Sequence, residues 1–343
     1  MNILDDQNAI AQRDPQNARD VALKQCEYFS AVFDAKFEPS GNVENIVWAG
    51  IGGSALPMVV VQSWPQLKIP FEIVRNYDIP PYVGPSTLFV ASSYSGNTEE
   101  TLSALEQAEQ TGAQIVIVAA GGKLADIARE KGYPLFSIPA GIQPRMATFY
   151  FVKAFLSIVA PLDAAVADVH EIESIGEWLR EELKAFAPDV PTEQNLAKQL
   201  AVQLSGKTVV MYAGPKLFPA ANKWKICFNE NAKNTAWVNQ YPEFNHNEFI
   251  GWSSHPVEKP FAVVEIRSSL EHLRVQKRFE VTERLLSGMR PSPIVVEPKG
   301  ETLLQQLAWS FAVGDLVSIY LAMLNGVNPT PVDLVEKLKV ELG

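Results

Sequence analysis

The chain has 343 residues, enough for two domains of ordinary size, and its apolar share of 47% allows each to bury a core. Lys and Arg total 29 against 39 Asp and Glu, so the net charge of −10 argues against a nucleic-acid-binding protein, which needs concentrated positive charge. The only cysteines, Cys26 and Cys227, are too few for a secreted disulfide scaffold. The polar opening lacks a signal-peptide pattern and no run of eighteen apolar residues follows, so we expect a cytosolic protein without a membrane span.

From residue 45 onward, short apolar runs alternate with amphipathic stretches. Strands are expected at 45–50, 71–76, 87–93, 114–120 and 134–140, with helices in most of the intervals. Runs rich in Val and Ile that alternate with helices are typical of βαβ units and of a parallel sheet covered on both faces. The first half of the chain is therefore predicted to be a doubly wound α/β domain.

The same pattern restarts after a charged helical stretch. Strands are expected at 208–214, 236–240, 261–268 and 293–298, and helices at 193–205, 217–234, 272–287, 301–325 and 331–342. The segments VWAGIGGSALP and VMYAGPKLFPAAN share one layout, a strand, a glycine turn and a helix start. We therefore predict two doubly wound parallel-sheet α/β domains in tandem, at 1–162 and 193–343, joined by a helical linker at 163–192.

Two polar loops follow strands of the first predicted domain. AGIGGSA (49–55) has glycines that let the backbone approach a ligand, and SSYSGNTEET (92–101) brings three hydroxyls ahead of a helix that Asn97 would cap. Helix N-termini present free N–H groups to anions. The first loop alone also fits a dinucleotide site, and the second alone fits a capped helix. Both at the carboxyl edge of one sheet favour a shared anion site.

The pair GIGGSA and SYSGNTEET resembles the sugar isomerase (SIS) domain and, in its wording, the bifunctional phosphoglucose/phosphomannose isomerase family. The resemblance spans about 45–343. It implies two SIS domains, a hexose 6-phosphate substrate, and no metal or other cofactor. The residues that it implies for holding the sugar phosphate are Gly53, Ser54, Ser93, Ser95 and Thr98.

Two catalytic candidates lie in the second half. Glu230 stands near the end of a predicted helix in CFNENAKN, where the alternative is an ordinary surface glutamate. His246 stands in EFNHNEF, a stretch expected to be non-helical, where the alternative is a structural loop histidine. The resemblance implies that Glu230 moves a proton between C2 and C1 and that His246 opens the sugar ring. In the family the histidine enters from the neighbouring subunit, which implies a homodimer.

The remaining candidates are a cation and two residues near the carboxyl end. Arg145, in QPRMA, is either a surface residue at a helix start or, as the resemblance implies, the group that stabilises an enediolate. The resemblance also implies that a lysine of the last helix reaches the sugar; Lys337 is our choice and Lys339 the alternative. Thr330 matches the position where the bifunctional enzymes have Thr, which implies room for both C2 epimers.

Three other functions compete with this one. A metal-dependent mannose-phosphate isomerase needs clustered His and carboxylate ligands, and only Glu243 and His246 have a suitable spacing. A Rossmann oxidoreductase would leave the SYSGNT loop unexplained. A phosphosugar sensor usually carries a DNA-binding segment, for which residues 1–44 are too short and too acidic.

Overall fold

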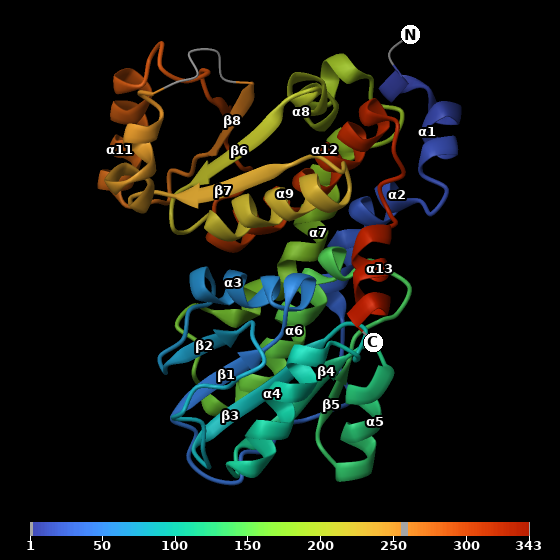
Figure 1. Cartoon of the computed structure of the whole chain (residues 1–343), viewed down its shortest axis with the longest axis vertical. Helices are drawn as coiled ribbons and strands as arrows, with labels where there is room; N and C mark the ends of the chain where they lie inside the picture. Colours follow the sequence, from blue (N-terminus) through green and yellow to red (C-terminus); the bar gives the residue numbers. More distant parts are fainter. Residues whose placement is uncertain (1–2, 255–259, 343) are drawn as a thin grey trace. The chain divides into compact units, whose positions relative to one another are not determined.

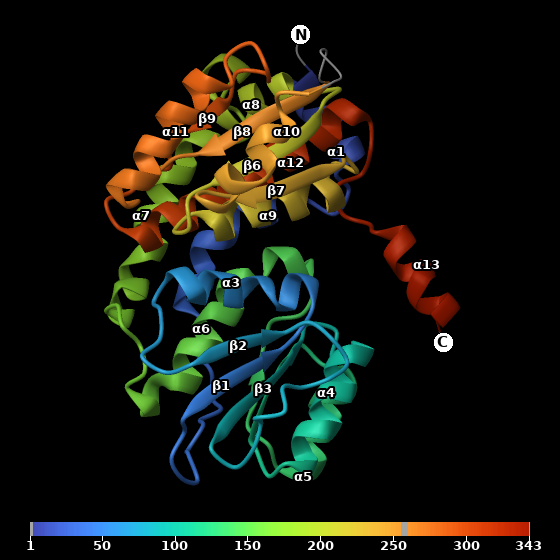
Figure 2. The ribbon, with the colours of Figure 1, turned by 60° about the vertical axis from the view of Figure 1, so that its left-hand side comes forward.

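The computed structural model describes residues 3–254 and 260–342, and Figures 1 and 2 show its ribbon from two directions. It divides into two compact units. One is Gln25–Gly176, and the other comprises the described residues of Met1–Lys24 and Glu177–Gly343. Each unit holds one parallel sheet, which confirms the prediction of two doubly wound α/β domains in tandem.

The sheet of the unit Gln25–Gly176 has five parallel strands in the order β2-β1-β3-β4-β5. Their bounds are β1 Asn45–Ala49, β2 Phe71–Val74, β3 Thr87–Ser93, β4 Gln114–Ala119 and β5 Leu135–Ser137. Every residue of β3 is buried, as expected for the central strand of a sheet covered on both faces. The chain reverses its direction of progress between β1 and β3, and ligands bind at such a switch point in open α/β sheets.

Helices cover both faces of this sheet, α4 and α5 on one and α3 and α6 on the other (Figure 1). Their bounds are α3 Leu56–Ser63, α4 Glu99–Gln110, α5 Gly122–Lys131 and α6 Thr148–Val159, with short 3-10 helices η3 Gly52–Ser54 and η4 Pro144–Met146. Strand residues alternate between the faces. Val47 packs with Ala104 and Leu105 of α4, whereas the Trp48 ring lies 5.8 Å from that of Phe155 in α6.

The second unit has a four-stranded parallel sheet in the order β7-β6-β8-β9, which repeats the first four positions of the other sheet. The strands are β6 Thr208–Ala213, β7 Ala236–Gln240, β8 Phe261–Ile266 and β9 Ile294–Val296. The helices are α8 Leu196–Leu204, α9 Phe218–Glu230, α10 Glu248–Gly251, α11 Leu273–Leu285, α12 Leu303–Asn325 and α13 Asp333–Leu342. An aromatic core that includes Tyr212, Tyr241, Phe244 and Phe279 lies between this sheet and α11.

Helix α12 is the central helix of this unit and packs against α8 and α9. Its 23 residues are apolar and long enough to cross a membrane by length and composition alone. Yet 94% of its most apolar stretch is buried inside the protein, as in the core helix of a globular domain.

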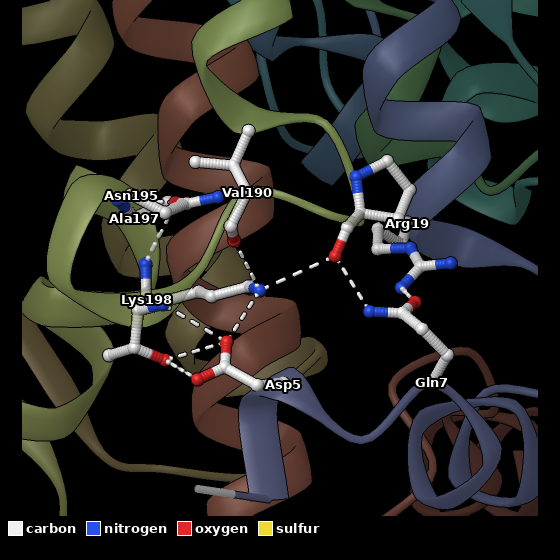
Figure 3. Close-up of polar contacts among 9 residues, drawn as sticks. Asp5, Gln7, Arg19, Val190, Asn195, Ala197 and Lys198 are labelled. Atoms are coloured by element: carbon white, nitrogen blue, oxygen red, sulfur yellow. Dashed lines mark hydrogen bonds and ion pairs between the residues drawn. The ribbon is translucent and has the colours of Figure 1, made fainter.

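The amino-terminal helices α1 (Gln7–Arg13) and α2 (Ala18–Leu23) belong to the unit that contains the second sheet, whereas we expected them with the first. Helix α2 packs against α12 of that unit. Figure 3 shows a further contact just ahead of α1: Lys198, only 1% exposed, needs a counter-charge, and Asp5 supplies it at 2.9 Å. Lys198 and Thr192 outweigh the effect of burial and lower the pKa of Asp5. The expected linker at 163–192 is likewise divided, since helix α7 (Ile172–Leu183) crosses from one unit into the other.

Candidate active site

The loop that follows β1 packs against two other segments of its unit. A Cβ atom on Gly53 would lie 2.7 Å from the carbonyl carbon of Pro144 and 2.8 Å from the amide nitrogen of Arg145. A Cβ on Gly50 would lie 2.9 Å from the carbonyl oxygen of Ser92. These positions need glycine because the backbones approach too closely for any side chain. The loop is thereby held against both the end of β3 and the Arg145 segment.

The loop that follows β3 gathers the three hydroxyls predicted to bind an anion. Ser93 Oγ lies 2.7 Å from Thr98 Oγ1 and 3.3 Å from Ser95 Oγ, and it accepts a hydrogen bond from the Gly96 amide at 3.1 Å. Ser54 joins them, because its Oγ accepts from the Tyr94 amide at 2.9 Å. The four hydroxyl groups that the sequence singled out therefore belong to one connected set at the switch point of the sheet.

Asn97 does not cap helix α4, contrary to our expectation. The N-cap is Thr98, and within the described chain its side chain makes no capping hydrogen bond. The Asn97 Oδ1 instead accepts from the Lys123 amide at 3.0 Å and so holds the first turn of α5. That long-range contact outcompetes the local cap. The N-terminus of α4 begins at this hydroxyl cluster, since its N-cap Thr98 belongs to the cluster, and the N–H groups of a first helical turn are suited to binding a phosphate.

Arg145 lies in η4 and is 1% exposed, so it is not the surface residue that the sequence left open. Its Nη1 donates to Gln143 Oε1 at 3.0 Å. A buried guanidinium is costly unless polar groups or anions surround it. Its backbone also touches the Gly53 loop, as described above, so the cation and the hydroxyl cluster belong to neighbouring segments.

Tyr94 connects these two segments, and sequence reasoning missed it. Its Oη donates to the Pro139 carbonyl at 2.9 Å and accepts from the Ile142 amide at 3.1 Å, just ahead of the Arg145 turn. Burial raises the pKa of Tyr94, so the hydroxyl stays protonated and able to donate. The sequence offered one signal. An aromatic residue inside SSYSGNT is not needed to hold an anion, so its presence indicates a structural role.

In the second unit, Glu230 is the last residue of α9 and is half-buried. A polar seam on α9 and α12 lies along the helix that carries it. Lys223 Nζ donates to Asp315 Oδ1 at 2.7 Å with both side chains fully buried, and Cys227 Sγ lies 3.0 Å from the same oxygen. Burial alone would lower the pKa of Lys223, but Asp315 and Cys227 outweigh it and raise it. Such a pair fixes the rotation of one helix against the other.

His246 closes a one-turn 3-10 helix, η9 (Glu243–His246), so the expectation of a non-helical stretch was wrong. Pro242 is the N-cap of η9, and proline is compatible with the start of a helix. Its neighbour Phe244 is buried, with its ring centre 4.4 Å from that of Tyr212. The imidazole of His246 itself is exposed. The element is therefore anchored by its aromatic side while the histidine points outward.

Asn245 and Asn247 flank this histidine and hold its backbone on both sides. Asn245 Nδ2 donates to Thr282 Oγ1 at 2.9 Å, which ties the element to α11. Asn247 Oδ1 accepts from the Glu248 amide and caps α10. The asparagines noted in the sequence thus serve as supports for the loop.

Thr330 and the two lysines lie at the carboxyl end of the chain. The Thr330 amide donates to Asn328 Oδ1 at 2.9 Å. Helix α13 begins at Asp333, two residues later than expected. Lys339 forms an ion pair with Glu336 at 2.7 Å, and both Lys337 and Lys339 are exposed. Across residues 3–254 and 260–342, no group of three or more His, Cys, Asp or Glu side chains is placed to hold a metal ion.

A search of curated proteins finds a relative that covers most of this chain. The bifunctional phosphoglucose/phosphomannose isomerase of Caldicellulosiruptor bescii is 36% identical over 88% of this chain and 90% of its own. The chain belongs to the bifunctional phosphoglucose/phosphomannose isomerase family. In agreement with this, residues 193–342 match the family model of the bacterial phospho-glucose isomerase C-terminal SIS domain.

Two further comparisons show how far the family fold extends. The D-glucosamine-6-phosphate 4-epimerase of Sulfolobus acidocaldarius is 29% identical over 86% of this chain and 88% of its own. A solved structure of a glucose-6-phosphate isomerase like protein from Thermus thermophilus aligns with a TM-score of 0.66 at 17% identity, over 99% of both chains. That low identity shows the shared fold alone, which confirms tandem SIS-type α/β domains for this member of the isomerase family.

Proposed function

We propose that this protein is an aldose–ketose isomerase that interconverts glucose 6-phosphate, and also mannose 6-phosphate, with fructose 6-phosphate. The observation that carries the proposal is the set of four hydroxyls, Ser54, Ser93, Ser95 and Thr98, at the switch point of the first sheet. The family relationship supports the same reaction. We further propose that the reaction needs no metal ion.

The phosphate of the sugar is the group that the first unit is built to hold. Hydroxyl donors and the N-terminus of α4 bind an anion through hydrogen bonds and the helix dipole. Binding energy from this phosphate, remote from the reacting carbons, orients C1 and C2. Arg145 then supplies a fixed positive charge for the enediolate that forms between them.

Proton transfer is assigned to the carboxylate of Glu230. In the open-chain aldose it removes the proton from C2, and a cis-enediolate forms across C1 and C2. The proton of the C2 hydroxyl passes to O1, and the same carboxyl group returns its proton to C1. His246 and Lys337 assist the ring opening that must come first, by moving protons at the ring oxygen and the C1 hydroxyl. Thr330, a small side chain, leaves room for both epimers at C2.

We also propose a cytosolic homodimer in which His246 serves the neighbouring subunit. His246 is exposed, and the nearby element α10 presents Ile250, 71% exposed, while β7 presents Trp237, 54% exposed. Exposed apolar side chains that gather into one contiguous patch mark association surfaces, and we propose that Ile250 and Trp237 belong to such a patch. Both cysteines are buried and neither forms a disulfide, which fits a reducing compartment.

A second function has its own supporting observation. The epimerase relative named above shares 29% identity, so epimerisation of D-glucosamine 6-phosphate competes with isomerisation of the neutral sugars. A non-catalytic phosphosugar regulator is the other alternative, since the hydroxyl cluster alone would suffice for binding.

The deciding experiment measures fructose 6-phosphate formation from glucose 6-phosphate and from mannose 6-phosphate, with EDTA present, for the wild type and Glu230→Gln. We expect the wild type to turn over both sugars. The rate should fall by about 10³-fold or more in Glu230→Gln, because glutamine keeps the size of the side chain but cannot act as a base. Glu106→Gln, an exposed glutamate of α4, is the matched control and should retain full activity.

The outcomes separate the alternatives. Epimerisation of D-glucosamine 6-phosphate without isomerisation would replace the proposed function with the epimerase. Phosphosugar binding without turnover would replace it with the regulator. Activity lost in EDTA and restored by a divalent ion would contradict metal independence.

A further inference from the structure

The turn that follows Glu230 is tied to the segment that carries Thr330, although almost a hundred residues separate them in the sequence. Asn325, the last residue of α12, donates from Nδ2 to the carbonyl of Ala232 at 3.0 Å. Lys233 Nζ donates to the carbonyl of Asn328 at 2.6 Å. Both bonds lie within one compact unit. The end of the helix bearing the base and the start of the specificity segment are thus held as one piece.

Asn328 is the centre of this connection because it contacts Thr330 in its own segment and two segments distant in the chain. Its Oδ1 accepts from the Thr330 amide at 2.9 Å, an Asx turn that sets the backbone of Thr330. Its carbonyl accepts from Lys233, and its Nδ2 donates to Gln16 Oε1 at 2.9 Å. The side chain of Asn328 therefore decides where Thr330 lies, and its backbone links that position to the turn after Glu230.

Lys233 adopts a backbone conformation that lysine rarely takes, with φ at +52°. Non-glycine residues in the left-handed region cost free energy and persist where the surrounding structure holds them. The surrounding turn is indeed held, since Asn231 is buried and donates from Nδ2 to Ser318 Oγ of α12 at 2.8 Å. The conformation directs the Lys233 ammonium to the carbonyls of Asn328 and, at 3.4 Å, Asn231.

We infer that Asn328 and Lys233 are positioning residues that set the place of Thr330 relative to Glu230 and thereby the acceptance of both C2 epimers. The inference rests on the proposed function. One carboxylate must reach the C2 hydrogen of two sugars whose configurations at C2 are opposite, so the two substrates need different rotations about C2–C3. A shift of Thr330 therefore affects one epimer more than the other.

The test is the ratio of kcat/KM for mannose 6-phosphate to kcat/KM for glucose 6-phosphate. Asn328→Ala removes the acceptor for the Thr330 amide, and we expect it to change this ratio by about fivefold or more, since small misplacements near reacting atoms have large effects. Asn328→Asp keeps an oxygen acceptor for that amide and should retain the wild-type ratio. Gln16→Ala, which removes only the third contact of Asn328, should retain it as well.

A second pair of variants, at Lys233, tests the inference even if the Asn328 variants fold poorly. Lys233→Met keeps the length of the side chain without its donor and should move the ratio in the same direction as Asn328→Ala. Lys233→Arg restores a donor and should return the ratio toward that of the wild type. Thermal midpoints measured on all variants separate a change in specificity from a loss of folded protein.

The possible failures are distinguishable. A wild type that uses neither sugar would overturn the proposed function and this inference together, and one that uses a single sugar would overturn the inference. A bifunctional wild type whose ratio is unchanged in both Asn328→Ala and Lys233→Met would overturn the inference alone. So would an equal change in Asn328→Ala and Asn328→Asp.

Discussion

The second sheet repeats the order of the first four strands of the other sheet, but the chemical groups at the two switch points differ. Between β1 and β3, the loops offer hydroxyl groups and the N-terminus of α4. Between β6 and β8, the equivalent place at the N-terminus of α9 is filled by the protein's own carboxylate, that of Glu271. The first switch point therefore presents hydroxyl groups, whereas the second is occupied by a carboxylate of the protein itself.

The Glu271 carboxylate occupies the second switch point through hydrogen bonds to backbone amides. Its Oε1 accepts from the amide of Lys216 at 2.8 Å and from that of Leu217 at 3.4 Å, and the residue is 5% exposed. A Cβ on Gly214 would lie 2.4 Å from its carboxyl carbon, so the glycine turn closes directly over it. Burial raises the pKa of Glu271, and the two backbone amides offset part of that effect.

The difference teaches that the doubly wound topology places a switch point but does not decide its chemistry. Loop side chains decide it. In this protein the first sheet carries the hydroxyls proposed to bind phosphate. The second carries the candidate base, at the opposite end of α9 from the turn that Glu271 holds.

Removing the hydroxyls of the first switch point has the largest expected effect. Ser93→Ala combined with Thr98→Val deletes two donors to a charged ligand, each worth about 1.5–3 kcal/mol, so kcat/KM should fall by roughly 10²–10⁴-fold. Steady-state kinetics on both sugars measures it. Ser157→Ala, which removes a hydroxyl of α6 away from the loop, should leave kcat/KM unchanged. A double variant as active as the wild type would contradict the assignment of this loop to the phosphate.

A glycine pair compares the two switch points directly. Gly96 has φ at +71° and a Cβ there would lie 1.8 Å from the Gly121 carbonyl oxygen, so Gly96→Ala should cost about 2–4 kcal/mol and abolish phosphate binding. For Gly214→Ala the three atoms nearest the added Cβ all belong to the side chain of Glu271, which can move, so this substitution should cost less. Denaturant unfolding gives both free energies, and inorganic phosphate titration gives binding. Equal effects of the two substitutions on phosphate binding would abolish the distinction between the loops.

Glu271 itself gives the smallest expected effect and tests its role as an internal anion. Glu271→Ala should lower the free energy of unfolding by about 1–2 kcal/mol, because the backbone amides of Lys216 and Leu217 lose their acceptor, with kcat/KM little changed. Glu271→Gln keeps the acceptor oxygen and should be closer to the wild type. A loss of phosphate-dependent activity in Glu271→Ala that matches the Ser93/Thr98 variant would make the second switch point a second ligand site.

The pH dependence of this carboxyl group has a defined sign. Because the folded pKa is raised above the ordinary value of 4.5, the group contributes stability below that value and loses it as pH rises through the folded pKa. The free energy of unfolding of the wild type, relative to Glu271→Gln, should therefore fall as pH rises from below 4.5 to above the folded pKa. A difference that stays flat with pH would show that the two backbone amides fully compensate for burial.

The sequence by itself determined the elements and the residues that could act. Val- and Ile-rich runs became parallel strands because a strand covered on both faces buries continuous apolar side chains. The hydroxyls of Ser93, Ser95 and Thr98 were predictable as a group since residues so close in the chain cannot lie far apart.

Tertiary structure alone decided the contacts between segments that are distant in the chain. Asp5 with Lys198, Asn97 with Lys123, Lys216 with Glu271, and Lys233 with Asn328 are pairings that no local pattern encodes. Each contact satisfies a buried charge or a backbone group that has no partner within the hydrogen bonding of strands and helices. The group that satisfies it is the one that the completed fold brings near. The contact of Asp5 with Lys198 joins the amino-terminal segment to the second unit, and that of Asn97 with Lys123 leaves Thr98 as the N-cap of α4. The contact of Glu271 with Lys216 occupies the second switch point.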